Sequence, residues 1–249
     1  MTNKTMIEWV GTGSGLNPVL GNTSFLVKGL DRILLVDCGF TVPSELIKQA
    51  KLKEVTDILI THIHADHIGG LESFGFMNYF AFKKRDEERP NLYLATDSIA
   101  QALWEHSLRG GMEHAQTDEN LLLNANLDTY FNVHVGNQIK IPGLPNLDFF
   151  PTLHVHKMEN YGIKIGEQAW YSGDTVELPN TTARLIFQDC QFYETKSDVH
   201  VSYDKLKREL PAEVRSRTHL VHLGGGWDKK DATADGFAGF VRPGDKFEL

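Results

Sequence analysis

The chain has 249 residues and a formal net charge of −8, with 25 basic and 33 acidic side chains. Apolar residues make up 41% and charged residues 23%, which is typical of a globular protein and excludes a disordered one. The acidic balance argues against an extended nucleic-acid surface. No apolar run approaches the roughly 18 residues of a membrane span, which predicts a cytoplasmic protein without a membrane segment.

The first sixty residues predict short strands separated by tight turns. β-prone runs cover 6–13, 22–29 and 32–39, a helix is expected over 44–55, and the apolar strand 57–61 follows. The turn THIHADH, residues 61–67, comes directly after this strand.

The middle of the chain mixes one strand with helical segments. The charged stretch 83–90 predicts a surface loop, and 91–96 a strand. A helix over 97–108 is expected, capped by Asp97 and stopped at Gly110-Gly111. Residues 110–131 predict a loop or helical insertion, and their His114 is either an exposed loop residue or part of a lid that reaches a partner subunit's site.

The second half is again rich in predicted strands, at 133–141, 146–155, 161–166, 168–175 and 185–190. A helix over 202–210 and a last strand and turn over 218–226 complete it. Because both halves contain strands and helices, the sequence predicts an α/β fold, one domain over 1–249 with two sheets and helices outside. The two cysteines, Cys38 and Cys190, lack metal-site spacing and are expected to be reduced and buried.

The turn after strand 57–61 concentrates metal-ligating side chains. His62, His64, Asp66 and His67 lie within six positions. Imidazole nitrogens and carboxylate oxygens suit Zn²⁺. His62 and His64 can converge from an extended segment, whereas Asp66 and His67 are adjacent and leave the chain in different directions. This arrangement favours two neighbouring metal ions over one.

Further ligands are expected downstream, each at the end of a predicted strand. His154 follows DFFPTL, Asp174 follows AWYSG, and His222 follows THLV. Strand ends deliver such side chains to one edge of a sheet. Asp174 is the candidate bridging ligand, because the glycine before it permits close approach.

The motif HIHADH, with PTLHV, YSGDT and LVHLGG downstream, resembles the metallo-β-lactamase superfamily. The resemblance implies an αββα sandwich with a binuclear metal site at the sheet edge. It implies one ion held by His62, His64 and His154, a second held by Asp66, His67 and His222, and Asp174 between them. Superfamily members with di-iron chemistry tend to carry glutamate at the position of His64, so hydrolysis with two Zn²⁺ per subunit is favoured, with Mn²⁺ as the alternative metal.

Two more residues match supporting positions of this superfamily. Asp37 matches an aspartate that orients the metal histidines, since a ligating imidazole usually donates its other N–H to a carboxylate; the alternative is a simple turn aspartate. His200 lies between Asp174 and His222, as a histidine does in the ribonuclease Z-like phosphodiesterase branch. A protonated imidazole there could assist departure of an alkoxide, unless its role is structural. Asp66 and His200 are therefore the candidate catalytic residues.

The compact layout is similar to the phage anti-Pycsar proteins and their bacterial relatives, with NTSFLV, YSGDT and DVHVSYDKL in corresponding places. This resemblance implies a homodimer that hydrolyses cyclic nucleotides, such as cyclic CMP and cyclic UMP, to nucleoside monophosphates and so evades an anti-phage defence. If the gene is phage-encoded, the protein would act in the host cytoplasm. Three alternatives stay open. They are a tRNA 3′-processing endoribonuclease, a lactone or thioester hydrolase, and a protein that sequesters a nucleotide without cutting it. The first is disfavoured because only positions 155–173 separate His154 from Asp174.

Overall fold

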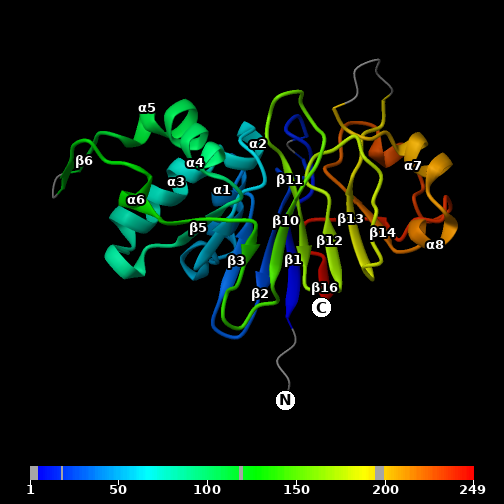
Figure 1. Ribbon diagram of the computed structural model, residues 1–249, viewed down its shortest axis with the longest axis horizontal. Coiled ribbons are helices and arrows are strands. Elements are labelled where there is room, and N and C mark those ends of the chain that lie inside the picture. Colours follow the sequence, from blue (N-terminus) through cyan, green and yellow to red (C-terminus); the bar gives the residue numbers. More distant parts are fainter. Residues whose placement is uncertain (1–4, 18, 118–119, 194–198) are drawn as a thin grey trace.

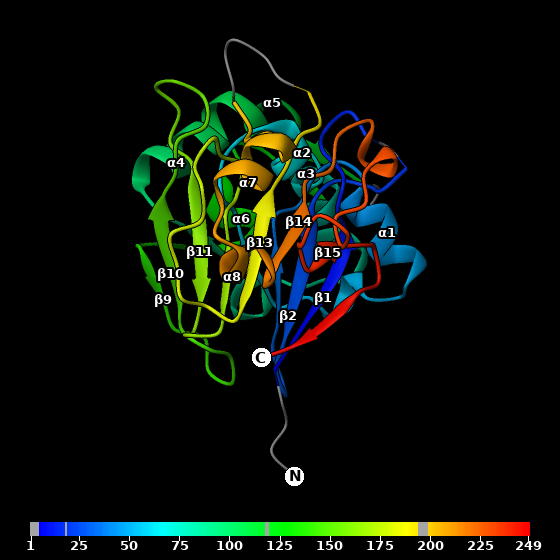
Figure 2. The ribbon, with the colours of Figure 1, turned by 90° about the vertical axis from the view of Figure 1, so that its right-hand side faces the viewer.

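Two seven-stranded β-sheets lie face to face in the computed structural model, which describes residues 5–17, 19–117, 120–193 and 199–249. Helices cover the outer face of each sheet, as Figures 1 and 2 show from two directions. This is the predicted arrangement of two sheets with helices outside. In the described part of the chain, no helix is both long and apolar enough to cross a membrane.

The first sheet is built mainly from the N-terminal half of the chain. Its spatial order is β16 (Lys246–Glu248), β1 (Met6–Gly11), β2 (Ser24–Lys28), β3 (Ile33–Val36), β4 (Asp57–Leu59), β5 (Asn91–Leu94) and β8 (Asn132–Val135). The strands from β16 to β3 pair antiparallel, and those from β3 to β8 pair parallel.

The second sheet repeats this pattern with the C-terminal half. Its spatial order is β15 (Gly239–Phe240), β14 (Thr218–Val221), β13 (Leu185–Asp189), β12 (Ala169–Tyr171), β11 (Tyr161–Ile165), β10 (Leu147–Pro151) and β9 (Gln138–Ile139). The strands from β9 to β12 pair antiparallel, and those from β12 to β15 pair parallel. The carboxyl ends of the parallel strands therefore meet at one edge.

The helices divide between the two outer faces (Figure 1). On the side of the first sheet lie α1 (Val42–Lys48), α2 (Ala65–Ile68), α3 (Leu71–Phe76), α4 (Asp97–Leu103), α5 (Arg109–Met112) and α6 (Leu127–Tyr130). The second sheet carries α7 (Tyr203–Glu209) and α8 (Ala212–Arg215). Short 3-10 turns (Leu52–Glu54, Asp86–Glu88, Trp227–Lys229), π-helical turns (Met77–Ala81, Trp104–Leu108) and a hairpin of β6 (Ala115–Gln116) and β7 (Leu121–Leu122) complete the described elements.

Aromatic side chains fill the space between the sheets. Trp9 lies 4.8 Å from Phe25 and 5.1 Å from Phe187, measured between ring centroids, and Phe25 lies 5.2 Å from Tyr171. All four side chains are buried. Each such pair contributes about 0.5–1.5 kcal/mol beyond its burial, so this core holds the two sheets in a fixed relation at the edge where the site lies.

Several local predictions are wrong. The single strand expected over 133–141 is two strands in different sheets, because Gly136, with φ +155°, turns the chain from β8 to β9. Thr96, and not Asp97, caps α4, since its hydroxyl accepts a hydrogen bond from the backbone N–H of Ile99. Gly110 and Gly111 lie inside α5 and do not end the helical segment.

The ends of two other predictions also differ. The helix expected over 44–55 is α1 followed by a separate 3-10 turn. The segment 218–226 is not the last strand, since β15 and β16 follow it. β15 and β16 have two and three residues, GF and KFE, and offer no β-prone run long enough to predict a strand.

Candidate metal centre

Backbone hydrogen bonds hold the turn 61–67 against the residues that follow β3. The backbone N–H of Cys38 donates to the carbonyl of His67 at 2.7 Å, and the N–H of Gly70 donates to the carbonyl of Cys38 at 2.8 Å. A Cβ atom built on Gly39 would lie 1.9 Å from the carbonyl oxygen of Asp66. Only glycine allows this approach, and it fixes the backbone from which the candidate ligands project.

The structure brings four of the predicted ligands into a first group, His62, His64, His154 and Asp174, whose ligating atoms all lie within 4.8 Å of one another. The Nδ1 atom of His64 lies 3.1 Å from Nε2 of His62 and 3.2 Å from Nε2 of His154. Three ring nitrogens thus converge on one point beside a carboxylate.

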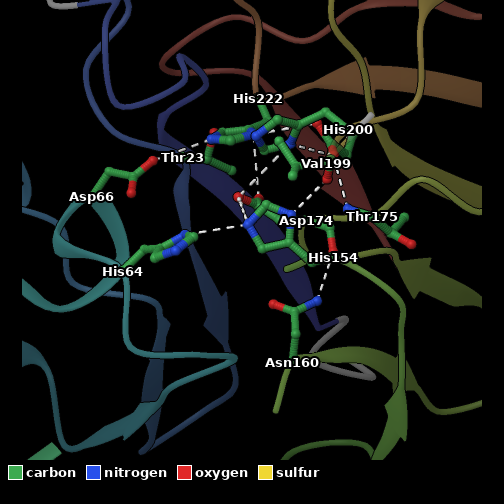
Figure 3. Close-up of polar contacts among 12 residues, drawn as sticks. Thr23, His64, Asp66, His154, Asn160, Asp174, Thr175, Val199, His200 and His222 are labelled. Atoms are coloured by element: carbon green, nitrogen blue, oxygen red, sulfur yellow. Dashed lines mark hydrogen bonds and ion pairs between the residues drawn. The ribbon is translucent and has the colours of Figure 1, made fainter. Parts of the chain in front are cut away.

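A second group lies alongside, formed by Asp66, His67, Asp174 and His222, again with ligating atoms within 4.8 Å. The Nε2 atom of His222 lies 3.2 Å from Asp66 Oδ2, and that of His67 lies 3.4 Å from Asp174 Oδ2. Asp174 belongs to both groups. Figure 3 shows His64 and Asp66 approaching from the segment around α2, with His154 and His222 opposite them.

Hydrogen bonds on the outer ring nitrogens orient these imidazoles. His67 donates from Nδ1 to Asp37 Oδ2 at 2.8 Å, and His154 donates from Nδ1 to the carbonyl of Val199 at 2.5 Å. The backbone N–H of Thr61 also donates to Asp37, at 2.9 Å. Asp37 therefore occupies the supporting position expected from the sequence, and the inner nitrogen of each ring is left facing the centre.

The donor set fits a metal ion. Among the described residues, His67 Nε2 and Asp174 Oδ1 are buried and have no hydrogen-bond partner. Each makes only ion-pair contacts, the shortest being His67 Nε2 with Asp174 Oδ2 at 3.4 Å and Asp174 Oδ1 with His222 Nδ1 at 3.2 Å, so both atoms are available to a metal ion. Burial, together with neighbouring histidines, lowers the pKa of His62 and of His64, so both rings are neutral near pH 7 and offer lone pairs. Converging imidazole and carboxylate donors of this kind suit Zn²⁺.

The second group carries more negative charge. Burial would lower the pKa of His222, but Asp174 and Asp189 outweigh it and raise this pKa to about 10. The pKa of Asp174 is held well below its usual range by His222 and His67, although burial acts in the opposite direction. A metal ion entering this group must displace protons from its histidines, which makes its binding depend on pH.

His200 lies beside the two groups and is held by a carboxylate that sequence reasoning missed. His200 Nδ1 donates to Asp189 Oδ2 at 2.8 Å, and His222 Nδ1 donates to Asp189 Oδ1 at 3.2 Å. The backbone N–H of Thr175 donates to the same carboxylate at 2.8 Å. Asp189 is the last residue of an apolar strand, and Asp37 and Asp174 follow shortly after the ends of theirs. This position at a strand end was the sequence signal that could have pointed to Asp189.

A cavity of about 150 Å³ opens over both groups. Its walls include His64, Asp66, Asp174, His200 and His222 from the groups just described, and Ser14, Gly15, Leu16, Gln191, Tyr193 and Gly224 around them. His114 lies elsewhere: its Nδ1 accepts the backbone N–H of Asn124 at 3.2 Å, at the base of the β6–β7 hairpin that projects from the helical side (Figure 1).

The family model described as "Anti-Pycsar protein Apyc1" matches residues 5–247. The chain belongs to the Apyc1 family. The Apyc1 protein of Paenibacillus harenae is 31% identical, over 98% of this chain and 99% of its own, and that of Bacillus phage BSP38 is 33% identical, over 90% and 91%. The resemblance inferred from the motifs is thus confirmed, and with it the prediction of a hydrolase of the phosphodiesterase type.

Solved structures confirm the predicted fold of this Apyc1-family protein. A metallo-β-lactamase fold protein of Bacillus subtilis, YhfI, superimposes with a TM-score of 0.72 at 16% identity, covering 99% of this chain and 100% of its own. A diphosphatase of the PhnP family gives 0.73 at 18% identity, covering 99% and 98%. At these identities the likeness establishes the metallo-β-lactamase fold alone.

Asp37→Ala is expected to weaken metal binding by this Apyc1-family protein about 10- to 100-fold, because His67 loses the acceptor that sets its tautomer and orientation. Competition with a chromophoric chelator would measure the affinity. Asp31→Ala, on the exposed turn before β3, is the matched control and should bind metal like the parent protein. Equal affinities for the two variants would contradict the supporting role of Asp37.

Proposed function

We propose that this protein is a binuclear zinc phosphodiesterase that hydrolyses cyclic nucleotides, such as cyclic CMP and cyclic UMP, to nucleoside monophosphates. The observation that carries the proposal is the pair of ligand groups that share Asp174, with His200 beside them in one small cavity. Membership of the Apyc1 family supports it, since the relatives are anti-Pycsar proteins.

We assign the ligands by group. His62, His64 and His154 would hold one Zn²⁺, Asp66, His67 and His222 the other, and Asp174 would contact both. Two such ions, when bound, lower the pKa of water and stabilise charge on the attacking and leaving oxygens. Mn²⁺ is the alternative metal, because the same nitrogen and oxygen donors accept it.

The residues of the chain account for the remaining steps. The carboxylates of Asp66 and Asp174 accept hydrogen bonds from the attacking water and direct it at phosphorus. Burial lowers the pKa of His200, but the charge and hydrogen bond of Asp189 outweigh it and raise this pKa, which favours the protonated form of the ring. With Nδ1 bonded to Asp189, the other ring nitrogen of His200 is left to donate a proton to the departing ribose oxygen.

The size of the cavity, the short chain between His154 and Asp174 and the net charge of the protein favour a small substrate. Its volume of about 150 Å³ lies below the roughly 300 Å³ at which pockets for drug-sized ligands begin. The chain between His154 and Asp174 forms only β11, β12 and their turns, and the net charge is −8. Both observations favour a cyclic nucleotide over transfer RNA.

The test is a substrate panel on the metal-loaded protein. Cyclic CMP and cyclic UMP should give nucleoside monophosphates by liquid chromatography, treatment with a chelator should stop the reaction, and added Zn²⁺ should restore it. Cleavage of precursor tRNA, a lactone or a thioester in place of the cyclic nucleotides would establish one of the alternatives. Binding of a cyclic nucleotide without any turnover would establish sequestration.

Homodimer formation, a cytoplasmic location and the evasion of anti-phage defence stay predictions. Sedimentation of the purified protein over a range of concentrations would establish whether two subunits associate. Production of the protein in bacteria that carry a cyclic-nucleotide defence, followed by phage infection, would test the biological role.

A further inference from the structure

The side-chain amide of Gln191 lies in the cavity without a hydrogen-bond partner. Gln191 is 3% exposed and lines the cavity together with Asp66, His200 and His222. Within the described ranges, neither its Nε2 nor its Oε1 atom makes a hydrogen bond. Buried polar groups are nearly always paired in folded proteins, so an unpaired amide in a functional cavity indicates a ligand that supplies both partners.

The backbone after β13 fixes where this amide points. Successive side chains of an extended segment alternate between faces, so Gln191 lies on the same side as Asp189, which bonds the site histidines, while Cys190 packs into a buried apolar cluster. The backbone of Gln191 is held on both sides, since its N–H donates to the carbonyl of Val201 at 3.0 Å and its carbonyl accepts from Tyr203 at 2.8 Å.

The chemistry of an amide selects the partner. A phosphate group offers only acceptors, so it would pair with Nε2 and leave Oε1 facing negative charge. A ribose hydroxyl, or a base edge with neighbouring N–H and C=O groups, both donates and accepts. We propose that Gln191 is a specificity residue that binds the nucleoside part of the substrate through such a neutral group. This inference rests on the proposed function.

The exposed residues at the rim of the cavity support a substrate whose nucleoside part extends outward past Gln191. Leu16 and Tyr193 line the same cavity and are 97% and 53% exposed. Aromatic side chains at such positions provide a surface on which the flat face of a base stacks. A cavity of about 150 Å³ accommodates the reacting phosphate and part of the sugar, which leaves the base at this apolar rim.

The test compares two glutamines of the same strand segment. Gln191→Ala in the metal-loaded protein should raise KM for cyclic CMP about tenfold, with kcat changed less than about twofold, because one hydrogen-bonded substrate contact is lost. The constants for bis(p-nitrophenyl) phosphate, which has no nucleoside, should not change. Gln188→Ala is the matched control, since this amide lies on the opposite face and donates to the carbonyl of Glu177. Gln191→Met preserves the side-chain volume if the alanine variant folds poorly.

Binding and substrate variation separate the outcomes. The Kd of the metal-loaded protein for CMP, measured by calorimetry, should rise by a similar factor in Gln191→Ala. A 2′-deoxy cyclic nucleotide that removes the difference between variant and parent identifies the ribose hydroxyl as the partner, and a persisting difference identifies the base edge. Unchanged KM and Kd would overturn the inference and leave the proposed function standing. If the parent protein cleaves bis(p-nitrophenyl) phosphate but no cyclic nucleotide, the proposed function fails. The inference is then decided by the Kd for CMP alone, compared between Gln191→Ala and the parent protein.

Discussion

His64→Ala is expected to lower phosphodiesterase activity about 10³-fold or more, because a catalytic metal supplies several kcal/mol of transition-state stabilisation. His64 Nδ1 lies 3.1 and 3.2 Å from the inner nitrogens of His62 and His154, so its removal leaves the first ligand group incomplete. His64 is only partly buried, and its truncation should not disturb the core.

Metal content and stability should be measured with activity. Mass spectrometry should find less bound metal in His64→Ala, and added Zn²⁺ should raise the Tm of this variant less than that of the parent, since an ion stabilises only the state that binds it. His156→Ala is the matched control, because this histidine is exposed and lies two residues beyond His154. Full turnover by His64→Ala would contradict the metal mechanism.

Asp189→Asn is expected to lower kcat for cyclic nucleotides about 10²- to 10³-fold, which is the usual contribution of a positioned general acid. The carboxylate of Asp189 raises the pKa of His200 against the effect of burial. Without this charge, His200 loses its proton at lower pH, and a general acid that has lost its proton cannot assist the leaving group. The alkaline limb of the pH–rate profile should therefore move to lower pH.

Asp189 also bonds His222, so the experiment must separate the two effects. Bis(p-nitrophenyl) phosphate has a good leaving group that needs little protonation, and its cleavage should fall much less than that of cyclic CMP. Equal losses on both substrates, with an unshifted profile, would show that Asp189 acts through His222 and the metal instead. Asp204→Asn, an exposed aspartate at the start of α7, is the control.

The sequence was sufficient to predict the seven candidate ligands because of where they lie. Four of them share a six-residue turn, and a turn that follows an apolar strand must lie at a sheet edge. His154, Asp174 and His222 could be added because each follows a predicted strand, and strand ends deliver side chains to the edge of a sheet. The strand-end position of Asp189 was an indication, but it did not assign Asp189 or Gln191 to the site, since a polar residue at or just after a strand end resembles any turn residue until the pairing of β12, β13 and β14 is known.

The errors in the prediction of the fold have the same origin. Whether 133–141 forms one strand or two depends on which sheet each half joins, and no local pattern records that choice. The pairing of β15 and β16 likewise depends on distant strands, β14 and β1. The longer strands were predictable because their apolar, aromatic and β-branched residues form continuous β-prone runs, a signal that is local in the sequence.

The ligands of each group come from both sheets: the turn after β4 supplies one part, and the loops after β10, β12 and β14 supply the other. A bound ion would thus connect the two sheets through its ligands. Shear of one sheet over the other would break coordination bonds, so metal binding would oppose a separation of the sheets that admits a substrate. Substrate entry and release would then depend on the loops that line the mouth of the cavity, and metal binding would add rigidity as well as chemistry.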